Sequence, residues 1–389
     1  MQTSTERLLT THTGSLPRPA NLTDRSDDAA VRAAVEETVS RQRAAGIDIV
    51  NDGEVSKPSY ATYVTERLTG FDGEPAVRQW RGRAVEDFPE YYERLRAQHG
   101  PGVATPPCTG PVAYTDAGRA KLAADIANLK AAVGNGTGAG NGTGGPATQD
   151  VFMSAASPGI IALYMPDNQY YASTEEYIFA LADAMKEEYD AIVAAGVILQ
   201  LDCPDLPAPV GNPGGSLDDA PAADVAEFRR QVAMRLEAVD HATRDIPPDR
   251  MRMHLCWGNG EGPHHTDVPL ARFIDLVLAA RPGAVSFEGA NPRHEHEWAL
   301  WEDVKLPDGK VIIPGVLDST TNFIEHPELV AQRLVRYADV VGKTSVIAGT
   351  DCGFATIAGM HTVDPRITWA KLAAMAEGAR LASDRLWRL

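Results

Sequence analysis

Apolar and polar positions follow two repeating patterns along the chain. Segments with apolar residues three and four positions apart predict amphipathic helices, and short, nearly all-apolar runs follow them. The helical patterns cover residues 28–46, 174–196, 224–246, 269–283 and 326–342, and a closing helix is expected from about Trp369. The apolar runs cover residues 47–54, 197–206, 251–257, 284–291, 311–320 and 344–353. Runs of this kind predict strands that are buried on both faces of a sheet.

Strand–helix alternation of this kind predicts a parallel sheet covered by helices. At least six such units in a chain of 389 residues favour a (β/α)8 barrel, the TIM-barrel fold, over a doubly wound sheet. The first strand is not followed by GxGxxG, which counts against a dinucleotide-binding sheet. We therefore expect an α/β protein with a single barrel domain over residues 1–389. Residues 131–150, rich in Gly, Asn and Thr, are expected to form a flexible surface loop insert.

Composition and charge narrow the classes of partner. The formal net charge is −17 and the chain has no basic cluster, so neither nucleic acid nor an anionic membrane surface is an expected partner. The sequence has neither a membrane-spanning apolar stretch nor a secretion signal at its start, and we expect a cytoplasmic protein. Four cysteines form no disulfide framework in a chain of this size, so a functional cysteine is expected to be a metal ligand or a nucleophile.

Chemistry-bearing side chains stand at the ends of the predicted strands, where (β/α)8 barrels place their active sites. They are Glu54, Asp202, Cys203, His254, Cys256, Glu288, Asp318, Asp351 and Cys352. His254 and Cys256 are two residues apart on one strand and point to the same face. An isolated pair of this kind is more often part of the core, but Glu288 and Cys352 end later strands of the same rim. An imidazole, two thiolates and a carboxylate suit Zn²⁺, so these four residues are the predicted metal ligands. Other histidines lie in polar loops beyond the strand ends and are expected to be solvated: His264, His265, His294 and His296.

Longer motifs add a family resemblance. They are "TTHTGSLPRP", "NDGE", "TGPV", "LQLDCPDL", "HLC", "FEGANPR" and "GTDCGFAT". Through them, most of the chain resembles the catalytic C-terminal barrel of the cobalamin-independent methionine synthases, in a superfamily that includes epoxyalkane:coenzyme M transferase and uroporphyrinogen decarboxylase. The resemblance assigns the same four residues to zinc. It also implies substrate-binding residues for homocysteine: Gly14, Ser15, Glu54 and Asp202. Without the resemblance, Gly14 and Ser15 could simply form a turn, and Glu54 could cap a helix.

These assignments predict a zinc-dependent transferase. It would activate a small thiol as a zinc-bound thiolate and alkylate it to a thioether, as in methyl transfer to homocysteine or a similar thiol. The family's DIHS histidine position holds Thr320 here, and Cys203 replaces a glutamate, which puts a folate donor in doubt. The alternative is an epoxide:thiol alkyltransferase of the coenzyme M type, with ring opening. Its alkoxide needs a proton, which Asp318, Tyr60 or His12 could supply. The alkyl or methyl donor, the thiol acceptor and the oligomeric state stay open.

Overall fold

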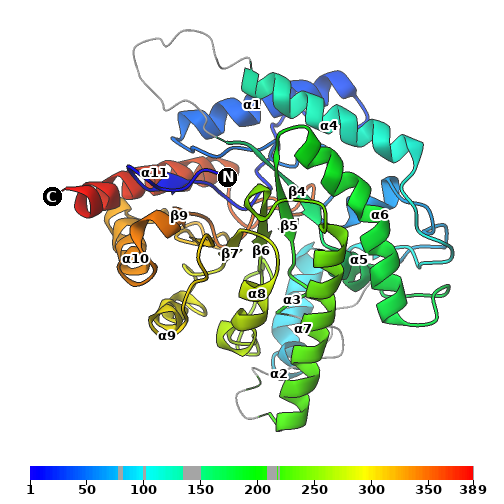
Figure 1. Cartoon of the computed structure of the whole chain (residues 1–389). Coiled ribbons are helices and arrows are strands. Elements are labelled where there is room, and N and C mark those ends of the chain that lie inside the picture. Colours follow the sequence, from blue (N-terminus) through cyan, green and yellow to red (C-terminus); the bar gives the residue numbers. More distant parts are fainter. Residues whose placement is uncertain (78–81, 100–101, 135–149, 208–216, 218–219, 389) are drawn as a thin grey trace.

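The computed structural model describes residues 1–77, 82–99, 102–134, 150–207, 217 and 220–388. A five-stranded parallel sheet in the order β4-β5-β6-β7-β8 lies at its centre, surrounded by the long helices (Figure 1). The strands are β1 (Leu9–Thr10), β2 (Ala76–Val77), β3 (Ala104–Thr105), β4 (Phe152–Ala156), β5 (Ile198–Asp202), β6 (Met251–His254), β7 (Ala284–Phe287), β8 (Val311–Pro314) and β9 (Ile347–Ala348). The predicted α/β class with a parallel sheet is confirmed.

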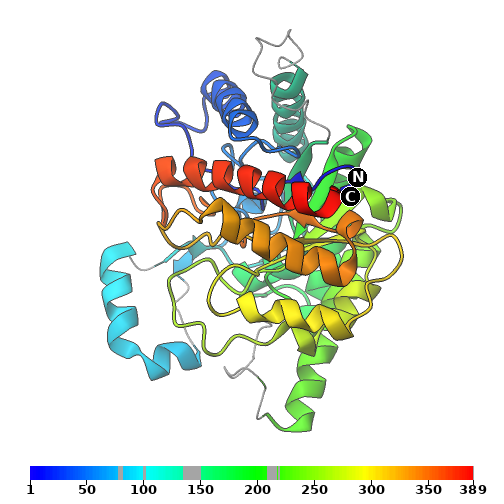
Figure 2. The same ribbon diagram turned by 90° about the vertical axis from the view of Figure 1, so that its left-hand side faces the viewer.

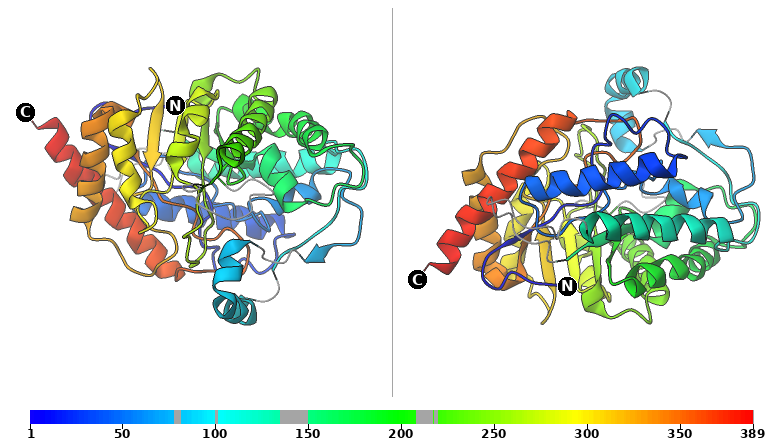
Figure 3. Two further views of the ribbon diagram at one scale, coloured as in Figure 1. Left: turned by 90° about the horizontal axis from the view of Figure 1, so that it is seen from below. Right: turned by 90° about the horizontal axis from the view of Figure 1, so that it is seen from above.

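The long helices lie on the outside of the central sheet in views from below and from above (Figure 3). The helices are α1 (Asp28–Ala44), α2 (Arg83–Asp87), α3 (Pro89–His99), α4 (Asp116–Gly134), α5 (Pro158–Tyr164), α6 (Thr174–Ala194), α7 (Ala222–Ala242), α8 (Ile274–Ala279), α9 (Leu300–Asp303), α10 (Pro327–Val341) and α11 (Pro365–Trp387). Short 3-10 turns are η1 (Thr62–Glu66), η3 (Pro248–Arg250), η4 (Leu270–Arg272), η5 (Glu295–Ala299) and η6 (Lys343–Ser345). None of these described helices is long and apolar enough to cross a membrane.

Helix ends follow local signals that the residues supply. The Asp27 side chain caps α1 by accepting from the N–H groups of Ala29 and Ala30. The closing helix begins at Pro365 rather than near Trp369, because Asp364 caps it and a proline suits the first turn. α10 and α11 then run side by side along one flank of the molecule (Figure 2).

Other segments depart from the expected pattern. The single helix expected over 269–283 is broken at Phe273 into η4 and α8. Of the expected loop insert at 131–150, residues 131–134 complete α4, and residues 135–149 lie outside the described part of the chain. Strand β4 and helices α2 to α5 lie in a stretch for which the sequence pattern gave no assignment.

The parallel pairing extends beyond both edges of the central sheet. β1 pairs in parallel with β9, with Leu9 opposite Ile347. The carbonyl of Thr10 accepts a hydrogen bond from the N–H of Ile49 at 3.0 Å. Isolated parallel bridges join Val50 to Val151, Ile312 to Val346, and Gly315 to Gly349. These contacts connect β8 to β9 on one side, and the segment around Val50 to β4 on the other.

Two separate apolar clusters stabilise this arrangement. The larger one packs the helices against the sheet. The smaller one takes single residues from most of the strands: Leu9, Ile49, Phe152, Ile198, Ala284, Val311, Ile313 and Ile347. Every residue of β4 to β8 is buried, as expected for a sheet covered on both faces.

Candidate metal centre

Three metal-ligating side chains converge at the ends of β6 and β9. The nearest ligand atoms of His254, Cys256 and Cys352 all lie within 4.8 Å of one another, and the two sulfurs are 3.5 Å apart. His254 Nδ1 lies 3.3 Å from Ser286 Oγ, whereas its buried Nε2 has no hydrogen-bond partner among the described residues. Two sulfurs bound tetrahedrally to one zinc ion, at about 2.3 Å each, would be about 3.8 Å apart. The spacing of the sulfurs and the unpartnered nitrogen therefore fit a zinc ion.

Burial sets the protonation of these groups. It lowers the pKa of His254 to about 3, with a further contribution from the positive charge of Arg252, so the imidazole is neutral near pH 7 and Nε2 can donate its lone pair. The hydrogen bond with Cys352, together with burial, raises the pKa of Cys256 well above its usual range. A bound dication reverses that preference, because thiols that coordinate zinc are deprotonated.

Glu288 lies beside this group but outside it. Its Oε1 accepts from the Trp257 N–H at 2.7 Å, and its Oε2 accepts from Asn291 Nδ2 at 2.8 Å. Burial, and then the neighbouring Cys256, raise the pKa of Glu288 well above its usual range. The structure thus brings three of the four predicted ligands to one point and holds the fourth next to Cys256 by two hydrogen bonds.

Asp351 holds the loop that carries Glu288. Its carboxylate accepts from the N–H groups of Gly289, Ala290 and Asn291 at 2.8 Å each, and from Asn291 Nδ2 at 3.0 Å. These bonds tie the segment after β9 to the segment after β7. The sequence marked Asp351 only as a strand-end acid; its anchoring role depends on contacts 60 to 62 residues apart in the chain.

Two buried carboxylates, Glu54 and Asp202, form a second polar group. Glu54 Oε1 accepts from Ser154 Oγ at 2.8 Å, and Asp202 Oδ1 accepts from Gln200 Nε2 at 2.8 Å. Burial, followed by the charge of Glu54, raises the pKa of Asp202 well above its usual range. Neither carboxylate forms an ion pair with a lysine or arginine of the described residues. The charges of Lys57 and Arg252 lower the pKa of Asp202 only in part, and a cationic ligand would offset the remaining cost of burying the two carboxylates.

The Gly14–Ser15 segment lies between these carboxylates and the loop that carries Cys352. A Cβ atom at Gly14 would lie 2.4 Å from Glu54 Oε1, so only glycine allows the carboxylate this close. The Ser15 carbonyl accepts from the Phe354 N–H at 2.8 Å, and a Cβ at Gly353 would lie 2.0 Å from Ser15 Oγ. The Gly14–Ser15 segment therefore packs against the loop that follows Cys352. Glu54 itself lies in a turn at a φ of 56° and starts no helix, so the helix-cap interpretation of Glu54 is wrong.

The predicted proton-transfer residues occupy three different environments. Tyr60 donates to the Tyr164 hydroxyl at 3.1 Å; burial, Tyr164 and then Cys256 and Cys352 raise the pKa of Tyr60 well above its usual range. Asp318 Oδ1 accepts from the N–H and the hydroxyl of Thr320 at 2.8 Å each. His12 is buried against Phe152, with Nε2 2.8 Å from Gln42 Oε1, and burial lowers its pKa to about 3. Of the three, Tyr60 is the one whose pKa shift has a contribution from Cys256 and Cys352.

His294 was expected to be solvated, and that expectation is wrong. Its side chain is buried, with Nδ1 2.8 Å from Glu297 Oε2 and Nε2 3.1 Å from Asp267 Oδ2. The ring packs on Trp257 with centroids 4.2 Å apart. His265 is partly exposed and pairs with Asp87 of α2 at 2.9 Å, so α2 contacts the loop that follows Cys256.

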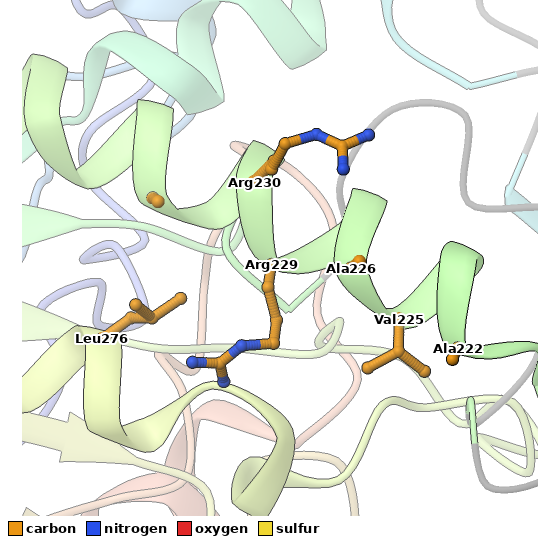
Figure 4. A pocket seen from close by; sticks show the side chains of 7 residues that line it. Ala222, Val225, Ala226, Arg229, Arg230 and Leu276 are labelled. Carbon is orange, nitrogen blue, oxygen red and sulfur yellow. The ribbon is translucent and has the colours of Figure 1, made fainter.

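A surface hollow elsewhere on the molecule has no part in this centre. It lies along the outer side of α7 and is closed on one side by Leu276 of α8 (Figure 4). Its other lining residues are Ala222, Val225, Ala226, Arg229, Arg230 and Ala233. No predicted site residue lines it.

Comparison with known proteins finds methionine synthases both among sequences and among solved structures. No family model matches the chain. It is 23% identical over 397 residues to a methionine synthase of Saccharolobus solfataricus, covering 98% of this chain and 96% of that protein. It is 22% identical to a methionine synthase of Sulfurisphaera tokodaii, covering 97% and 94%. A B12-independent methionine synthase from Shewanella sp. W3-18-1, solved in complex with selenomethionine, has the same fold, with a TM-score of 0.72 at 22% identity over 98% of this chain and 100% of that one. Over nearly its full length the chain is thus similar to methionine synthases, and it shares the fold of a B12-independent one.

Proposed function

We propose that this chain is a zinc-dependent methyltransferase that methylates the thiol of homocysteine or a similar amino acid. The observation that carries the proposal is the convergence of the His254 imidazole with the sulfurs of Cys256 and Cys352, together with the unpartnered Nε2 of that ring. A bound zinc ion would favour the ionised form of a substrate thiol, which is the nucleophilic form. The methionine synthases named above, which match the chain over nearly its full length, support methyl transfer.

The chain's own residues would bind and orient the substrate. We propose Glu54 and Asp202 as the carboxylates that hold its ammonium group, because both are buried and the charges of Lys57 and Arg252 offset the raised pKa of Asp202 only in part. Gly14 and Ser15 would hold the rest of the amino acid, since their segment packs between the two carboxylates and the loop that follows Cys352. Glu288 would complete the metal ligands once its hydrogen bonds to Trp257 and Asn291 yield. Tyr60 is the best-placed proton-transfer residue.

We further propose that the strands close into a single (β/α)8 barrel around this site. Support comes from the bridges that connect β8 through β9 and β1 to residues 49 and 50, and from there to β4. The inner apolar cluster also fits, because a closed barrel fills its interior with layers of side chains taken from its strands.

The proposal is tested by comparing two buried cysteines. Cys352→Ser removes a predicted ligand, whereas Cys108→Ser changes a buried cysteine outside the group as a control. We expect about one zinc per chain in the wild type and in Cys108→Ser, with formation of methionine from L-homocysteine and a methyl donor. Cys352→Ser should lose both zinc and product.

Two outcomes would contradict the proposal. One is a natively purified wild type without zinc, and the other is Cys352→Ser with full zinc content and activity. A parallel assay with an epoxide and coenzyme M tests the alternative. A thioether formed there, with no methionine in the first assay, would favour the epoxide reaction.

A further inference from the structure

Arg252 is a buried cation in the middle of β6. It precedes His254 by two residues and shares its face of the strand. Its side chain is 1% exposed, and its guanidinium carbon lies 3.5 Å from the centroid of the Phe152 ring. It forms no ion pair with a carboxylate of the described residues. Its three hydrogen-bond acceptors are neutral, and the charges of Asp202 and Asp150 act on it without a direct contact. Because burying a cation in this way is costly, its place on the face of His254 points to a role in the site.

The guanidinium binds β5 and the segment that follows β1. Nε donates to Gln200 Oε1 at 2.7 Å, Nη1 to Thr11 Oγ1 at 2.9 Å, and Nη2 to the His12 carbonyl at 2.8 Å. Thr11 and His12 lead directly into the Gly14–Ser15 segment. Arg252 therefore joins the strand of His254 to the chain that forms one side of the substrate pocket.

Arg252 also fixes the orientation of the Gln200 amide. A guanidinium can only donate, so Gln200 must turn its oxygen toward Arg252 and its NH2 group the other way. That NH2 group donates to Asp202 Oδ1 at 2.8 Å and to the Thr13 carbonyl. With the amide reversed, Asp202 would face an oxygen. The position of the Asp202 carboxylate thus depends on a residue that does not touch it.

We propose that Arg252 is a positioning residue that acts through Gln200. It holds Asp202 and the Thr11–Thr13 segment in the geometry that binds the ammonium group of an α-amino acid thiol. The inference rests on the proposed function and adds the residues that would favour an amino-acid thiol, because a thiol without an amino group gains nothing from this geometry. Arg252 itself touches no substrate atom in this account.

Binding to the zinc-loaded protein tests this without a methyl donor. Isothermal titration calorimetry would compare L-homocysteine with 4-mercaptobutyrate, which lacks the amino group. The ratio of the two affinities is the readout, because a general loss of structure weakens both ligands. In the wild type we expect homocysteine to bind more tightly. Arg252→Lys keeps the charge but not the planar fork, and should lower the ratio at least about tenfold, with zinc content unchanged.

Two further variants separate positioning from folding. Gln200→Leu leaves Arg252 in place and should lower the ratio by a similar factor, and the double variant should lose little more, because both act through one contact. Arg67→Lys is the matched control. Arg67 is a buried arginine that pairs with Asp125 and Glu188 in another network, and its change should leave the ratio unaltered.

The outcomes divide as follows. A ratio unchanged in Arg252→Lys and Gln200→Leu, while the wild type prefers homocysteine, overturns the positioning role and leaves the proposed function intact. Equal loss of both ligands, or loss of zinc, in these variants shows a merely structural role and also overturns it. A zinc-loaded wild type that binds neither thiol overturns the proposed function, and this inference with it.

Discussion

Asp52→Asn is expected to stabilise the protein, although it removes a charge from the turn that carries Glu54. The Asp52 side chain is 2% exposed, and burial raises its pKa from an ordinary 3.8 to about 6, despite the nearby positive charge of Lys57. This difference corresponds to about 3 kcal/mol at 25 °C. Near pH 7 the folded protein therefore ionises Asp52 at a cost that the unfolded chain does not have. Asparagine avoids this cost and keeps an oxygen that can accept from the Glu54 N–H, now 3.0 Å from Oδ1.

The pH dependence gives the sharper test. The folded pKa is the higher one, so ionisation of Asp52 costs nothing below pH 3.8, an increasing amount up to about pH 6, and a constant amount above that. Urea unfolding of Asp52→Asn and wild type at pH 4, 5, 6 and 7.5 should show a gain that grows with pH to at most about 3 kcal/mol. Asp48→Asn is the control and should lower the free energy of unfolding, because it breaks the ion pair of Asp48 with Arg7 at 2.5 Å. A variant less stable than wild type at pH 7.5, or a gain independent of pH, would refute the reasoning.

Other perturbations give further expectations. Gly14→Ala places a methyl group 2.4 Å from Glu54 Oε1 and should weaken homocysteine binding, measured by calorimetry, by about tenfold or more. Gly134→Ala is the control: a Cβ atom there would meet no neighbouring atom within 4 Å, so this variant should bind as the wild type does. Asp351→Asn disturbs the hydrogen bonds that hold the Glu288 loop and should lower zinc affinity by about 10- to 100-fold. Competition with a chromophoric chelator measures this, and an unaltered affinity would show that Asp351 does not support the metal site. His12 has a pKa of about 3 in the folded state, so the unfolded chain takes up its proton first as pH falls below 6.5. The wild type should therefore lose up to about 5 kcal/mol more than His12→Gln between pH 6.5 and 3, and parallel acid-unfolding curves of the two proteins would contradict this.

The periodic signals in the sequence predicted most of the α/β repeats from residue 174 onward. Period-two spacing also indicated that His254 and Cys256 share a face, and Cys352 joins them as expected. The same spacing places Arg252 on that face, but the nearly all-apolar run around it gives no sign of a buried cation.

What the sequence could not predict depends on contacts between distant segments. The hydrogen bonds that hold Glu288 beside Cys256 come from the Trp257 backbone and from Asn291, a residue that Asp351 anchors. His294 is buried between two carboxylates, and one of them, Asp267, comes from a loop 27 residues earlier. Neither contact leaves a trace in local spacing or hydrophobicity.

Zinc-edge X-ray absorption, with and without L-homocysteine, tests the central claim most directly. The account predicts that the protein alone shows zinc bound by two sulfurs, one nitrogen and an oxygen, and that homocysteine adds a third sulfur at about 2.3 Å. A protein without bound zinc, or a zinc spectrum that the thiol leaves unchanged, would contradict it.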